Sequence, residues 1–167
     1  MRYLLIIAVI CIYGTSNVFG FSKSYPETDP EFEKIYRLID SFHYDSAIRQ
    51  SQKLIPSLNG DNKLGEANFN IAYAHERSGR PFRAIQYYYR AAGHYTSEAC
   101  LSNTFENIGL IYKSFNQHDK AVYYFNKAVA LQKEGSADRM KKLYSRSASL
   151  RRNDQTALAL NDLLEAE

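Results

Sequence analysis

The stretch Phe105–Ala128, FENIGLIYKSFNQHDKAVYYFNKA, contains the pattern that decides the fold. Its first half places Phe, Ile, Gly and Tyr at positions i, i+3, i+4 and i+7, which lie on one face of an α-helix. The polar residues NQH then interrupt the pattern, and the second half places Ala121, Phe125 and Ala128 on one face of another helix. The stretch therefore predicts two antiparallel helices joined by a short turn.

A related pattern recurs along the chain at a nearly constant interval. Ala47, Ala84, Ala121 and Ala157 lie in similar tetrapeptides, DSAI, FRAI, DKAV and QTAL, and are separated by 37, 37 and 36 residues. A fixed period in this range is typical of proteins built from repeated helical units. The 167 residues of the chain accommodate about four such units.

Small residues at fixed positions let the two helices of a unit approach closely, and an aromatic residue one turn later fills the space between units. One helix pair cannot bury its apolar face alone, so successive pairs stack. The residues that we predict to make these packing contacts are Ala47, Ala84, Tyr88, Ala91, Phe105, Ile108, Gly109, Tyr112, Ala121, Phe125 and Ala128.

These residues resemble the tetratricopeptide repeat, whose consensus is a large aromatic residue, Leu-Gly, Tyr, Ala, an aromatic residue and Ala. The match is most complete from Phe105 to Ala128. In the preceding unit, Asn68, Ala72 and His75 replace the first aromatic residue, the glycine and the tyrosine. The resemblance implies an all-α fold of stacked antiparallel helix pairs, a solenoid whose outer two units are degenerate. We expect the units at residues 29–60, 65–97, 102–134 and 137–166.

Turn residues suggest where the helices begin and end. Gly79 suits a helix C-terminus, Pro81 suits the first turn of the next helix, and Gly135-Ser136 is expected to end one unit and cap the next. The period exceeds the usual length of about 34 residues, and we assign the extra residues to longer loops near residues 59–62 and 96–98. Asn103, three residues before a glutamate, predicts a capping box at the start of the third unit.

The N-terminus has the features of a secretory signal peptide. Arg2 precedes an apolar run, YLLIIAVICIY, which is too short to span a membrane, and a small residue follows at Gly20. We expect a signal peptide at residues 1–20, a linker at 21–28 and the repeat domain at 29–167. A lipidated signal at Cys11 is disfavoured, because Ile10 stands where such signals have a small residue. Cleavage would leave Cys100 as a single thiol without an internal disulfide partner.

Sequence motifs for catalysis, metal binding or phosphate binding are absent. The chain has no CxxC, HExxH, GxGxxG, GxxxxGK[ST] or GxSxG pattern. Its net charge is +3, with basic and acidic residues interspersed, so no sequence feature favours nucleic acid. We expect no catalytic residues, no metal and no cofactor. The tyrosine runs YYY at 87–89 and YYF at 123–125 are interpreted as packing between repeats rather than as a binding cage.

The resemblance also implies a binding surface. In tetratricopeptide proteins the first helices of successive pairs line a concave groove that holds a peptide or a partner helix. Some members clamp a peptide carboxylate with a set of Lys and Asn residues, and this sequence lacks the full set. The groove positions that correspond in this chain are Phe32, Tyr36, Phe69, Asn70, Tyr73, Arg77, Glu106, Asn107, Leu110 and Lys113.

Two functions from different classes are compatible with these features. The first is an exported scaffold, periplasmic or secreted and of bacterial origin, that binds a protein or peptide partner in its groove. The second is the extracytoplasmic sensory part of a longer membrane signalling protein. Membrane attachment is expected only through an uncleaved signal or through a C-terminal continuation. An enzyme is a third hypothesis, which no residue constellation supports.

Overall fold

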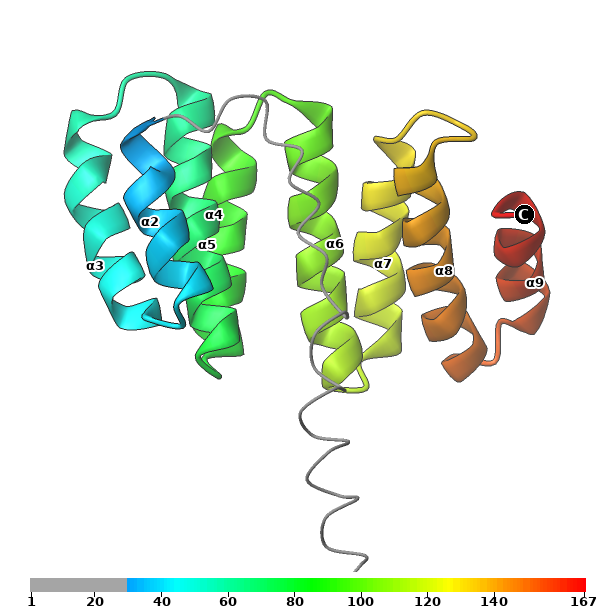
Figure 1. Ribbon diagram of the computed structural model, residues 1–167. Coiled ribbons are helices and arrows are strands. Elements are labelled where there is room, and N and C mark those ends of the chain that lie inside the picture. The colour runs from blue at the N-terminus through cyan, green and yellow to red at the C-terminus, as the bar shows by residue number, and fades with distance from the viewer. Residues whose placement is uncertain (1–29) are drawn as a thin grey trace, which may run out of the picture.

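The structure, a computed structural model, describes residues 30–167 (Figure 1). The signal peptide and linker predicted for residues 1–28 lie outside this part of the chain. Within it the fold is all-helical. The elements are α2 (Pro30–Asp40), α3 (Tyr44–Leu54), the 3-10 helix η1 (Ile55–Ser57), α4 (Asp61–Arg77), α5 (Pro81–His94), α6 (Glu98–Ser114), α7 (His118–Ala130), α8 (Ala137–Arg152) and α9 (Thr156–Glu165).

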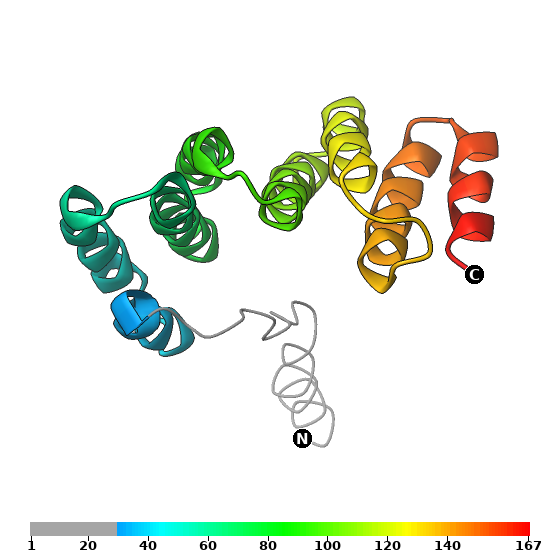
Figure 2. The same cartoon turned by 90° about the horizontal axis from the view of Figure 1, so that it is seen from above.

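Consecutive helices run antiparallel and form four pairs, α2–α3, α4–α5, α6–α7 and α8–α9 (Figure 1). Seen from above, the pairs follow an arc, with the first helix of each pair on the inner side and the second helix on the outer side (Figure 2). Each pair contacts mainly its neighbours, as in a repeat protein that is extended in one dimension. The predicted all-α solenoid of stacked helix pairs is confirmed.

The length of the repeat comes from its first helices. Both α4 and α6 have 17 residues, and three-residue connections precede and follow the 14-residue helix α5. The assignment of the extra residues to longer loops was therefore wrong. The first helices of the second and third units also begin four residues before the expected unit starts, at Asp61 and Glu98.

The capping box predicted at Asn103 is absent, because α6 begins five residues earlier, after Ser97. The Asn103 side chain instead accepts a hydrogen bond from Nζ of Lys142, at 3.1 Å, across to α8. One residue before Asn103, the buried hydroxyl of Ser102 donates to the Ala128 carbonyl at 2.7 Å. Contacts between helices, which local capping preferences do not include, hold this first turn in the helix.

Two of the predicted turns have the expected geometry. Gly79 follows α4 with φ +76° and Pro81 is the first residue of α5. Gly135 has φ +69°, a left-handed conformation that costs glycine little because it has no Cβ. Ser136 then caps α8, since its hydroxyl oxygen accepts a hydrogen bond from the backbone N–H of Arg139 at 3.2 Å. These two boundaries are confirmed.

The core lies between the helices of adjacent units. One apolar cluster joins the first unit to α4, and a second joins α4, α5 and α6. Phe105 and Tyr112 are half-buried beside the second cluster. The other residues that the sequence assigns to packing are buried: Ala47, Ala84, Tyr88, Ala91, Ile108, Gly109, Ala121, Phe125 and Ala128.

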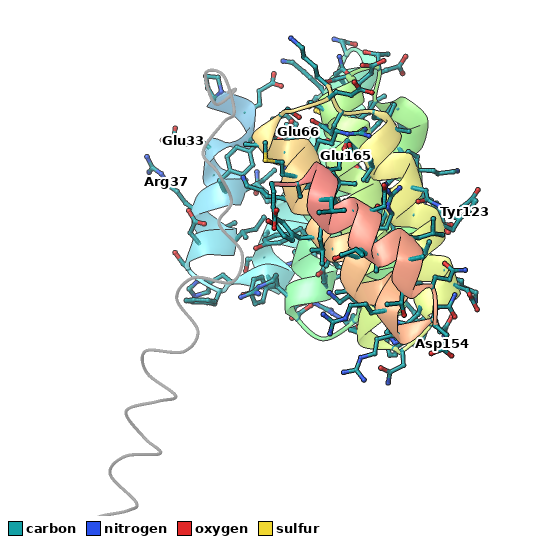
Figure 3. The ribbon with its side chains drawn as sticks, turned by 90° about the vertical axis from the view of Figure 1, so that its right-hand side faces the viewer. Glu33, Arg37, Glu66, Tyr123, Asp154 and Glu165 are labelled. Carbon is teal, nitrogen blue, oxygen red and sulfur yellow. The ribbon has the colours of Figure 1, made fainter. Side chains whose placement is uncertain are left out.

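Charged hydrogen bonds join the two helices of the fourth unit. Its apolar cluster is small and contains Val129, Leu143 and Ala166. Arg146 of α8 forms a two-pronged ion pair with Asp162 of α9, at 2.5 and 2.8 Å. Glu165, near the end of α9 (Figure 3), accepts from Nε of Arg139 at 2.6 Å. Charged hydrogen bonds therefore add to a small apolar cluster in the fourth unit, whereas the central units have larger apolar clusters.

Candidate partner-binding surfaces

The inner face of the arc carries only part of the predicted groove. Phe32 and Phe69 are buried at 1% and 5% exposure and belong to the apolar core. The Phe69 ring packs edge-on against Tyr88, with ring centroids 5.3 Å apart. Asn70 is 2% exposed, and its Nδ2 has no hydrogen-bond partner. These three assignments to the groove are corrected: their side chains lie between helices, where a partner cannot contact them.

In the first two units, the accessible groove positions are Tyr36, Tyr73 and Arg77. Tyr36 donates a hydrogen bond to Glu66 of α4, which orients its ring. Tyr73 is half-buried, and burial raises the pKa of its hydroxyl. Arg77 is exposed, and a hydrogen bond with Tyr44 raises its pKa. This part of the inner face therefore combines two partly exposed aromatic rings with one cation.

In the third unit, Glu106, Asn107, Leu110 and Lys113 are all partly exposed on α6. Glu106 forms an ion pair at 3.0 Å with Lys142, whose side chain is 3% exposed, so this carboxylate serves contact between units. Asn107 makes no hydrogen bond within residues 30–167. Its amide group is therefore available to a partner beside the apolar side chain of Leu110.

The tyrosine runs join the second unit to the third. Tyr88 and Phe125 are fully buried. The hydroxyl groups of Tyr89 and Tyr124 form a hydrogen bond between α5 and α7. The pKa of Tyr89 is raised, mainly by burial and also by this bond. Tyr124 also stacks on Tyr112 at 5.5 Å. These contacts agree with the interpretation of the runs as packing between repeats.

A second surface, which the sequence analysis missed, is formed by residues of α3 and α5, the outer helices of the first two pairs (Figure 2). Here a pocket of about 380 Å³ separates α3 from α5, and the end of α4 closes it. Most of its charged side chains are arginines. Its lining residues are Asp45, Ile48, Arg49, Gln52, His75, Arg80, Arg83, Gln86, Tyr87 and Arg90.

No local signal in the sequence indicated this pocket. Arg49 and Arg90 are 41 positions apart, and acidic residues separate them along the chain. The arginines form no charge run in the sequence, and only the stacking of α3 beside α5 brings them together. A search for basic residues at matching positions of successive second helices would also have failed, because the position one 37-residue period after Arg49 is the neutral Gln86.

Other kinds of site find no support in the part of the chain that the structure describes. Within residues 30–167, no group of three or more His, Cys, Asp or Glu side chains is arranged to hold a metal ion. Over the same residues, no helix has both the length and the apolar character needed to cross a membrane.

The comparison with known families agrees with the arrangement of α4 to α7. Residues 63–134 match the sequence profile described as the tetratricopeptide repeat. This part of the chain consists of tetratricopeptide repeats. The tetratricopeptide fold is in general a scaffold for protein interactions without catalytic activity.

Solved structures share the same fold at low sequence identity. The MamA protein is 18% identical, with a TM-score of 0.66 over 81% of this chain and 69% of MamA. Tetratricopeptide-like repeats assigned to a kinesin light chain of Podosopora anserina are 15% identical, with a TM-score of 0.66 over 81% of this chain and 71% of theirs. BtubC from P. vanneervenii is 20% identical, with a TM-score of 0.63 over 81% of this chain and 57% of BtubC. No curated protein sequence matches this chain.

Proposed function

We propose that this protein is an exported scaffold that binds an extended peptide or a partner helix on the inner face of its tetratricopeptide array. The observation that carries the proposal is the row of partly exposed side chains on α4 and α6, namely Tyr73, Arg77, Asn107, Leu110 and Lys113, which the core leaves available.

The shape of the array supports a peptide-like ligand. Stacked helix pairs produce an extended concave surface, which repeat proteins use for binding. Aromatic rings such as Tyr73 offer apolar area together with a polar tip, and Asn107 offers both a donor and an acceptor for peptide groups. An amphipathic helix or an extended segment satisfies such a surface at several points along its length.

The groove proposal predicts the effect of removing its two central side chains. In the double variant Tyr73→Ala/Asn107→Ala, partner capture from a native extract should weaken by about tenfold or more, because anchoring side chains contribute about 2 kcal/mol or more. The measurement is the amount of bound partner, identified by mass spectrometry, across a dilution series. Circular dichroism should show unchanged helicity.

Tyr123→Ala is the matched control. Tyr123 is 53% exposed and projects outward from α7 (Figure 3), so its removal should leave capture unchanged. Equal capture by the groove variant and the wild type would place the partner on another face and contradict the proposal.

Export is supported by the charged start, apolar run and small-residue end of residues 1–20. The native protein should begin at Phe21, which sequencing of its N-terminus tests directly. An N-terminus at Met1 in protein recovered from the cytoplasm would contradict export while leaving the groove proposal intact.

A further inference from the structure

The outer pocket between α3 and α5 has a strongly positive lining. Four arginines face it, at positions 49, 80, 83 and 90, against the single carboxylate of Asp45. Arg80 is neutralised by an ion pair with Asp45 at 2.5 Å. Within the described residues, Arg49, Arg83 and Arg90 form no ion pair of their own, although Asp45 also attracts Arg49. Four arginines and one aspartate give the lining a formal charge of +3, equal to the net charge of the whole chain.

Several of these groups are held in place before any ligand arrives. Arg80 is fixed by Asp45 and by two hydrogen bonds to the Ser78 hydroxyl, at 2.9 and 2.7 Å. The Arg90 guanidinium lies 4.7 Å from the centre of the Tyr87 ring. Tyr87 in turn stacks on His75, with ring centroids 5.5 Å apart. Such pre-positioning reduces the entropy that a binding site loses when it takes up a ligand.

The pocket also contains a polar group that the protein leaves unsatisfied. His75 lines it and is 4% exposed, and its Nδ1 has no hydrogen-bond partner. Burial lowers the pKa of His75, and the charges of Arg80 and Arg83 lower it further. The arginines therefore create a positive potential at the imidazole, which an anion beside them would offset.

The chemistry of the lining favours carboxylates on a peptide. Arginine binds a carboxylate through two parallel hydrogen bonds, and each guanidinium group on α3 and α5 can bind one carboxylate of the partner. Gln52 and Gln86 add donors and acceptors suited to peptide groups, and Ile48 and Tyr87 add apolar contacts. Nucleic acid is disfavoured, because basic and acidic residues are interspersed over the rest of the chain.

We propose that the pocket between α3 and α5 binds an acidic segment of a protein partner, with clustered Asp or Glu carboxylates paired to Arg49, Arg83 and Arg90. The site lies on the outer side of the array, opposite the groove proposed above. It therefore provides a second attachment point, and it does not depend on the groove.

The test uses fluorescein-labelled hexaglutamate as the probe and anisotropy as the readout. The double variant Arg83→Gln/Arg90→Gln should bind the probe about tenfold or more weakly than the wild type, since charge-assisted hydrogen bonds contribute about 1.5–3 kcal/mol each. Arg151→Gln/Arg152→Gln, which removes two exposed arginines at the end of α8, is the matched control and should bind within about twofold of the wild type. Hexaglutamine should not bind.

A second readout locates the probe. Hexaglutamate should raise the pKa of His75, followed by NMR of its ring protons, because added carboxylates favour the imidazolium form. Equal loss of binding in both arginine variants, or probe binding that leaves His75 unmoved, would overturn the proposal. Displacement of the probe by inorganic phosphate beyond the effect of ionic strength would assign the site to phosphate instead. The groove variant Tyr73→Ala/Asn107→Ala should bind hexaglutamate normally, which separates the two proposals.

Discussion

Replacing Arg146 with alanine is expected to destabilise the fourth unit by about 3–5 kcal/mol and to release α9 from α8. Arg146 bonds both carboxylate oxygens of Asp162, whose side chain is 3% exposed. It also donates to Asn126 of α7 at 2.8 Å. Truncation leaves the Asp162 carboxylate buried without its cation, which costs more than the loss of an exposed ion pair.

Amide hydrogen exchange measures the loss of stability separately for each helix. In the Arg146→Ala variant, the amides of α9 should exchange much faster than in the wild type, while those of α4 and α5 should be little changed, because stability in a repeat array is largely a matter of nearest neighbours. Arg152→Ala, which removes an exposed arginine of α8, serves as the control. Replacing both partners, as Arg146→Met/Asp162→Leu, should restore much of the protection. Wild-type protection of α9 in Arg146→Ala would show that the apolar contacts of α9 suffice.

Replacing Gly109 with alanine is expected to cost about 1–3 kcal/mol, because the added methyl group overpacks the contact between α6 and α7. A Cβ at Gly109 would lie 2.8 and 2.9 Å from two carbon atoms of the Phe125 ring. That ring is fully buried, so any shift that makes room for the methyl group disturbs other packed side chains. Urea unfolding followed by circular dichroism measures the change.

Gly93 provides the matched control, since it also lies within a helix but has no atom within 4 Å of the position where its Cβ would be. Gly93→Ala should be neutral or stabilising, by up to about 1 kcal/mol. In a Phe125→Leu background, which opens space at the contact, Gly109→Ala should cost less than it does alone. Equal stabilities of the two glycine variants would contradict the close approach at Gly109.

The alanine spacing predicted the fold, although its fourth position was wrong: Ala157 is exposed, and Ala159 is the buried alanine of α9. Ala84, Ala121 and Phe125 lie in the core because apolar residues at helical spacing share one face of a helix, and that face packs against the neighbouring helix. Gly79 and Pro81 located a turn for an equally local reason, namely the backbone conformations that these two residues favour.

The rest depended on contacts between elements that are distant in sequence. Asn103 has the composition of a cap, but its partner Lys142 belongs to another unit. Phe32 and Phe69 occupy positions that the family consensus assigns to the groove, and the rotation of each helix against its neighbours instead turns them into the core. The arginine pocket has no counterpart in any continuous segment, because α3 and α5 meet only after the units stack.

The central units and the C-terminal unit are held together by different kinds of contact, so the two parts of the array respond differently to mechanical force. The apolar clusters around α4 to α6 and the ionic contacts between α8 and α9 are arranged in series along the array. A force applied between its two ends therefore acts on both. The Arg139–Glu165 ion pair is partly exposed, so water can replace it as the helices separate, whereas the interlocked apolar side chains of the central units must leave their packing together. Under tension α8 and α9 would therefore separate first, so the array would be stiffer at its centre than at its C-terminal end.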